Sequence, residues 1–129
     1  MEIIFLIGRI IFGGYFIRNA FNHFLNHAAL EGYTASKGVS MPALAVFVTG
    51  VLLLVGGIGV LLGIFIEWAL LSLVLFLIPV SFIMHAFWKV SDPMAKSAEQ
   101  INFMKNMALL GAVFIMFAIP TPWPYSFSL

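Results

Sequence analysis

The stretch that decides the fold is PALAVFVTGVLLLVGGIGVLLGIF, which occupies residues 42–65 and contains no ionisable side chain. A helix needs about 20 mostly apolar residues to cross the hydrocarbon core of a bilayer. This segment exceeds that length without a single charge. It is therefore predicted to be a membrane-spanning helix.

The rest of the chain shares this apolar character. Its 129 residues are 63% hydrophobic and 9% charged, whereas soluble domains carry about 25% charged residues. Too few polar side chains remain to cover a water-exposed surface, so a soluble monomer and a disordered chain are both excluded. The net charge of +1 offers no general basic surface, so nucleic acid is not an expected partner. The chain has no cysteine, which excludes disulfides, thiolate metal sites and cysteine-bound iron–sulfur clusters.

Three further segments can span a membrane. Residues 68–87 follow the first segment after only a few residues, so the two form a tight antiparallel hairpin. Residues 3–24 form the first span despite their polar side chains, and residues 103–119 form the last.

The last helix is expected to begin before its span. Ser-Asp-Pro at residues 91–93 offers a capping side chain and a proline at the first helical position, so the helix starts near residue 93 with a short amphipathic lead-in. The chain is thus predicted to be a single all-α transmembrane domain over residues 1–129, an antiparallel four-helix bundle integral to the membrane.

The basic residues indicate the orientation of the bundle. The two longer connections lie on one side, which carries Arg18, Lys37, Lys89, Lys96 and Lys105. The other side carries only Arg9. The positive-inside rule therefore predicts cytoplasmic longer loops and both termini outside, as in a multi-pass protein of a prokaryotic cytoplasmic membrane.

The first span carries a stripe of polar side chains on one helical face: Tyr15, Asn19, Asn22, His23 and Asn26. Lipid cannot satisfy such groups, so they face the bundle interior or a wet cavity. The last three lie at the helix end, where the alternative is contact with water or headgroups. Arg9 and Asn19 lie deeper and favour an internal role. For Arg9 that role includes hydrogen bonds to backbone carbonyls of a neighbouring helix.

The third and fourth spans offer polar partners at a similar level. Ser81, His85 and Trp88 share one face of the third span. Glu99, Asn102 and Asn106 share one face of the last helix, where Lys105 can extend to the interface. The alternatives are an interfacial histidine bound to a neighbouring helix and a solvated amphipathic face around Glu99.

Residue counting brings these groups together. At 1.5 Å rise per residue, His23, His85 and Asn106 lie within about 5 Å of one another in depth. They are predicted to enclose a polar site between the first, third and fourth spans, under an aromatic lid of Phe87, Trp88 and Phe103. The candidate binding residues are Arg9, Asn19, His23, His85, Trp88, Lys105 and Asn106.

A quinone or a lipid is the expected ligand of this site. His85 or His23 would hydrogen-bond a ring carbonyl, and Lys105 would favour a negatively charged headgroup or reduced ring. Neither a metal nor a haem is expected. His23 and His27 have metal-compatible spacing but no third ligand, and His23 with His85 is the only plausible axial pair.

The glycines of the second span, Gly50, Gly56, Gly57, Gly59 and Gly63, favour close packing between helices. The alternative is a cavity beside them, filled by a flat ring or a lipid chain.

These features together resemble the DoxX family of small four-helix membrane proteins. The resemblance covers residues 3–118. It depends on Gly8-Arg9 in the first span, the glycines of the second, His85-Ala86-Phe87-Trp88 at the end of the third, and Phe103-Met104-Lys105-Asn106 leading into Leu109-Leu110-Gly111. Family members often have a basic residue where this chain has Glu67, and Gly-x-x-Lys where it has Arg18-Asn19 and Asn22-His23.

The resemblance implies roles in membrane redox complexes. Some members look like small subunits of quinone-linked enzymes, including a thiosulfate:quinone oxidoreductase, and others join complexes that handle thiol or oxidative stress. The expected function is therefore a quinone- or lipid-binding accessory subunit, with other redox subunits or a second copy as partners. The chain has no redox centre of its own, so it is at most a subunit of a quinone-linked oxidoreductase. The alternatives are a non-catalytic scaffold or lipid-binding protein that recruits partners through its glycine faces and, third, a small-solute transporter.

Overall fold

The computed structural model describes residues 1–128, which form five α-helices and one short 3-10 helix, η1. Four segments are long and apolar enough to cross a membrane: Glu2–Leu25, Pro42–Leu62, Ile66–Lys89 and Pro93–Phe117. The predicted all-helical membrane fold is confirmed. The elements are α1 (Glu2–Leu25), α2 (His27–Ser36), α3 (Pro42–Leu62), α4 (Ile66–Ile83), η1 (Phe87–Lys89) and α5 (Pro93–Phe117).

The helix ends follow local chemistry. α5 begins at Pro93, and the Asp92 carboxylate accepts a hydrogen bond from the backbone N–H of Ala95 at 2.9 Å, so the predicted start is confirmed. α3 ends three residues before the predicted limit, because Gly63 adopts a left-handed φ of 73° and turns the chain toward α4. The predicted tight hairpin between α3 and α4 is present.

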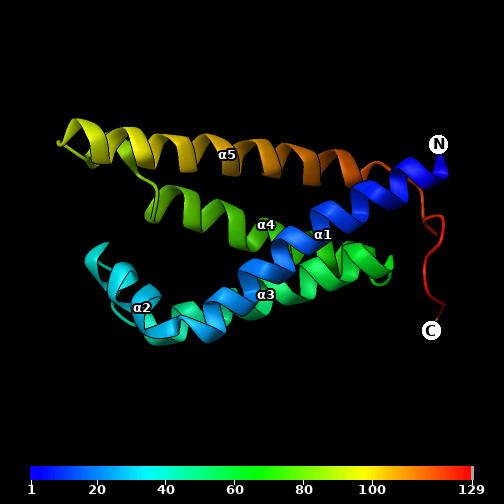
Figure 1. The fold of residues 1–129 in the computed structure, drawn as a ribbon, viewed down its shortest axis with the longest axis horizontal. Helices are drawn as coiled ribbons and strands as arrows, with labels where there is room; N and C mark the ends of the chain where they lie inside the picture. The colour runs from blue at the N-terminus through cyan, green and yellow to red at the C-terminus, as the bar shows by residue number, and fades with distance from the viewer. Residues whose placement is uncertain (129) are drawn as a thin grey trace.

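Two local features differ from the expectations. The longer connection after the first span is not a plain loop, because His27–Ser36 forms the helix α2, which packs on α3. The third predicted span, residues 68–87, lies within the segment Ile66–Lys89, but that segment is not one continuous helix, because α4 ends at Ile83 and the chain turns through Met84 before η1. Both differences lie at the same end of the molecule (Figure 1).

The spans are packed in a row. α1 packs on α3, α3 on α4 and α4 on α5, whereas α1 and α5 do not pack against each other. Figure 1 shows the two termini at one end of the molecule's long axis and α2 at the opposite end, which we call the α2 end. The core between the spans is apolar and includes Phe16, Leu53, Leu70, Leu73, Leu77 and Val113.

Glycines allow the close approach of α1 and α4 to α3. A Cβ on Gly13 of α1 would lie 2.7 Å from the carbonyl oxygen of Gly57, and one on Gly59 would lie 2.4 Å from the Cβ of Ala69 in α4. The prediction of glycine-mediated helix packing is therefore confirmed. The same contacts bury this glycine face inside the chain, so it is not a free surface for recruiting partners.

Candidate functional site

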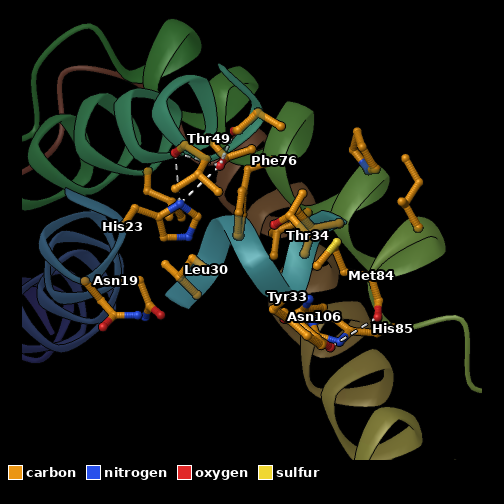
Figure 2. Close-up of a pocket in the computed structure, with 18 of the residues that line it drawn as sticks. Asn19, His23, Leu30, Tyr33, Thr34, Thr49, Phe76, Met84, His85 and Asn106 are labelled. Atoms are coloured by element: carbon orange, nitrogen blue, oxygen red, sulfur yellow. Dashed lines mark hydrogen bonds between the residues drawn. The ribbon is translucent and has the colours of Figure 1, made fainter. Parts of the chain in front are cut away.

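A cavity of about 300 Å³ lies between the helices at the α2 end of the molecule. All five α-helices contribute to its lining. Its walls are largely apolar and include Phe16, Leu30, Val46, Leu53, Phe76, Leu77, Val80 and Leu109. Polar side chains reach it from two sides: Asn19, His23 and Thr49 on one, and Tyr33, His85 and Asn106 on the other (Figure 2).

His23 is fixed by its contacts with α3. Its Nδ1 lies 3.1 Å from the Val46 carbonyl oxygen and 3.1 Å from the Thr49 hydroxyl. The ring can lie this close because of Gly50, where a Cβ would be 3.1 Å from the His23 Cβ. On the same side, the Asn19 amide nitrogen donates to the Tyr15 carbonyl at 2.8 Å, which leaves the Asn19 side-chain oxygen available.

His85 belongs to a polar cluster at the mouth of the cavity. Its Nδ1 lies 2.7 Å from Oε2 of Glu99. The Tyr33 hydroxyl donates to Oε1 of Glu99 at 2.6 Å, and the Lys37 ammonium lies 3.5 Å from the same oxygen. Burial, together with the hydrogen bond to Glu99, raises the pKa of the Tyr33 phenol above its ordinary value, so Tyr33 remains a donor.

Glu99 therefore does not lie on a freely solvated face, so the alternative of a solvated amphipathic face around Glu99 is wrong. Its side chain is only 13% exposed and has three partners. The predicted alignment of Glu99 with Asn106 along α5 does hold, but Glu99 acts on the ring of His85 rather than lining the cavity itself.

Asn106 is the least satisfied polar group of the site. It is 5% exposed, and no hydrogen bond joins its amide to another residue within 1–128. No fully buried side-chain nitrogen or oxygen among the described residues lacks a hydrogen-bond partner, so the Asn106 amide atoms are accessible, and Asn106 lines the cavity. Its neighbour Lys105 also lines the cavity and forms no ion pair with the described residues.

Arg9 lies at the other end of the molecule. It is 2% exposed, and its Nε donates to the Val60 carbonyl at 3.0 Å and its Nη2 to the Leu61 carbonyl at 2.9 Å. The carbonyl of Pro124 accepts from Nη1. The predicted hydrogen bonds to a neighbouring helix are confirmed, but Arg9 does not line the cavity.

Trp88 is also outside the cavity lining. It forms an edge-to-face cluster with Phe87 and Phe103, with ring centroids 5.3 and 5.6 Å from its own, and it is 48% exposed. The predicted aromatic cluster exists, but it does not cover the cavity. Because α4 ends at Ile83, Trp88 leaves the helical face that it would have shared with His85.

The histidines do not gather as metal ligands. His27 begins α2 and contacts Glu31 at 3.1 Å, away from the partners of His23. Within residues 1–128, no three side chains of His, Cys, Asp or Glu come close enough to hold a metal ion.

Comparison with known families decides the wider assignment. The family model DoxX matches residues 4–86, which is more than half of the chain. The chain belongs to the DoxX family. The resemblance seen in the sequence is thereby confirmed. No curated protein and no solved structure matches the chain.

Only part of the candidate site of this DoxX protein lies within the residues that the family model matches. Asn19, His23 and His85 lie within residues 4–86, whereas Glu99, Lys105 and Asn106 lie beyond them on α5. The cavity of this DoxX protein therefore combines a region shared with the family model and a helix outside the match. Of the seven predicted site residues, the cavity brings together Asn19, His23, His85, Lys105 and Asn106.

Proposed function

We propose that this DoxX protein binds a quinone-class ring in the cavity at the α2 end and acts as an accessory subunit of a membrane redox complex. The observation that carries the proposal is Asn106, which is 5% exposed, lines a largely apolar cavity and forms no side-chain hydrogen bond with another described residue, so its amide is open to a ligand. A ring with oxygen atoms on opposite sides needs apolar walls and a few convergent polar groups. The cavity has both.

The two polar sides of the cavity suit the two ring oxygens. Asn106, Lys105 and His85 would bind one oxygen, and Asn19 and His23 the other. Phe76 and Leu77 would contact the ring faces from α4. When bound, the quinone supplies redox chemistry that the side chains of this chain lack, so the electrons must come from or go to another subunit.

The row of helices explains how a membrane-soluble ligand could reach the site. Since α1 and α5 do not pack directly against each other, we expect bilayer lipid to cover that side of the bundle. The cavity is lined from both of these helices, by Asn19 on α1 and Leu109 on α5. A hydrophobic tail attached to the ring can therefore leave between them into lipid.

The proposal is tested by mass spectrometry of small molecules that co-purify in mild detergent. The wild-type protein is expected to retain a quinone in stoichiometric amounts. Asn106→Leu removes the unpaired amide while keeping the branching and the number of side-chain heavy atoms, and it should lower the retained quinone about tenfold, as expected for one lost hydrogen bond in a buried site.

Asn102→Leu is the matched control, because Asn102 lies one turn earlier on α5 and does not line the cavity. It should retain quinone at the wild-type level. Recovery of phospholipid alone from the wild-type protein would refute the quinone proposal and support the lipid-binding alternative.

A further inference from the structure

The two histidines of the cavity are held in the same way. His23 Nδ1 contacts the Val46 carbonyl oxygen at 3.1 Å, and His85 Nδ1 contacts the Glu99 carboxylate at 2.7 Å. Carbonyl and carboxylate oxygens only accept hydrogen bonds, so each Nδ1 must carry the proton. In a neutral imidazole the other nitrogen, Nε2, is then a bare acceptor.

The second contact of His23 agrees with this assignment. The Thr49 hydroxyl has one proton, and its shortest contact, 2.7 Å, is to the Ala45 carbonyl oxygen. It therefore meets His23 Nδ1 with its oxygen, as an acceptor. Within residues 1–128, no carboxylate forms an ion pair with His23 that would favour a second proton on the ring.

His85 is oriented by Glu99 from α5. Oε2 of Glu99 lies 2.7 Å from His85 Nδ1, and Oε1 accepts a hydrogen bond from the Tyr33 hydroxyl at 2.6 Å. Both His23 and His85 line the cavity.

We propose that the cavity selects the reduced, dihydroxy form of the ring over the oxidised dicarbonyl form. This inference rests on the proposed function. The hydroxyls of a hydroquinone donate to the bare Nε2 atoms of His23 and His85, while Asn106 and Lys105 donate to the hydroxyl oxygens. The carbonyl oxygens of a quinone carry no hydrogen, so they would face two lone pairs and leave both histidines unpaired.

The test compares three ring probes of nearly equal shape. These are tetramethylhydroquinone, tetramethyl-1,4-benzoquinone and the dimethyl ether of the hydroquinone, each partitioned between protein-containing and empty nanodiscs without oxygen at pH 8. The hydroquinone is expected to bind at least tenfold more tightly than the quinone. The dimethyl ether, which cannot donate, should bind no better than the quinone.

Two variants test the role of the fixed ring nitrogens. Glu99→Gln replaces an obligatory acceptor by an amide that can also donate to Nδ1, so the preference for hydroquinone should fall at least threefold. His23→Gln offers both a donor and an acceptor and should have the same effect, and it serves if Glu99→Gln is unstable. His27→Gln, outside the cavity, should leave the preference unchanged.

Nitrogen-15 spectra of histidine-labelled protein give a readout independent of binding. Bare Nε2 and protonated Nδ1 are expected for both His23 and His85. Protonated Nε2 on both rings, or equal or tighter binding of the quinone, would overturn this inference and leave the proposed function intact. If none of the three probes binds and no quinone co-purifies, both proposals fail.

Discussion

The two ends of the molecule treat buried polar groups in opposite ways. The other end holds both termini and the segment after α5, residues 118–128, and we call it the tail end. There Arg9 is almost fully buried, and its donors reach carbonyl oxygens of α3 and of this segment. At the α2 end, Asn106 is nearly as buried, yet its amide has no partner among residues 1–128. Burial alone therefore does not mark a binding site. The distinguishing feature is whether the chain itself completes the hydrogen bonds.

The tail end is also closed by aromatic packing. Trp123 is 2% exposed and meets Phe5 of α1 edge to face at 5.2 Å, and the backbone N–H of Phe127 donates to the Leu62 carbonyl at 3.0 Å. These contacts tie the end of the chain to α1 and α3. At the α2 end, α1 and α5 do not pack directly on each other, and α5 is joined instead to α2 through the hydrogen bond between Tyr33 and Glu99.

The largest expected effect is all-or-none labelling of the two ends. The chain has no cysteine, so Ser128→Cys at the tail end and Ser97→Cys at the α2 end each give a unique thiol. The basic residues at the α2 end predict that an impermeant maleimide added outside intact cells modifies Ser128→Cys and spares Ser97→Cys. The reverse pattern would place the cavity toward the outer side.

Arg9→Leu should be the most damaging substitution. It leaves the Val60 and Leu61 carbonyls and the tail without their donor, at a cost of about 3 kcal/mol. Folded yield and the thermal unfolding midpoint should both fall. Arg18→Leu changes an exposed arginine on the same helix and should have little effect. Equal stability of the two variants would contradict a structural role for Arg9.

Gly13→Ala tests the α1–α3 contact that lies between the two ends. The added Cβ would lie 2.7 Å from the Gly57 carbonyl oxygen, so we expect destabilisation of about 1–3 kcal/mol. Gly14→Ala meets nothing within 4 Å and should be neutral or slightly stabilising. Thermal unfolding of both variants in one detergent measures the difference, and identical midpoints would show that α1 can move away from α3 freely.

Asn106→Leu should have the smallest effect on stability, and with the opposite sign to Arg9→Leu. In protein stripped of bound small molecules, replacing an unpaired amide by an apolar side chain is expected to stabilise by less than about 1 kcal/mol. Its thermal midpoint should therefore equal or exceed that of the wild type. A fall as large as that of Arg9→Leu would mean that the Asn106 amide is paired after all.

The sequence predicted the features that depend on local rules. Apolar length gave the four spans, the Asp92–Pro93 pair gave the start of α5, and the cost of a guanidinium in lipid gave the carbonyl contacts of Arg9. Residue counting also placed His23, His85 and Asn106 at one cavity.

The missed features depend on contacts between distant segments. α2 is short and contains Gly32, so its stability comes from packing on α3, which no periodicity reveals. Glu99 looked solvated because its partners Tyr33 and Lys37 come from the other end of the sequence. The position of Trp88 was missed because no proline or glycine directly follows Ile83 to signal that α4 ends there.

The row arrangement of the spans has a mechanical consequence. α1 and α5 are connected through three successive interfaces, α1–α3, α3–α4 and α4–α5. If each interface rotates by a small angle, the three rotations add and change the spacing between the outer helices. The segment after α5 limits this spacing at one end, where Phe127 bonds to Leu62 of α3, and the hydrogen bond between Tyr33 and Glu99 limits it at the other. A distance measured between α1 and α5 at the α2 end would report on this spacing directly.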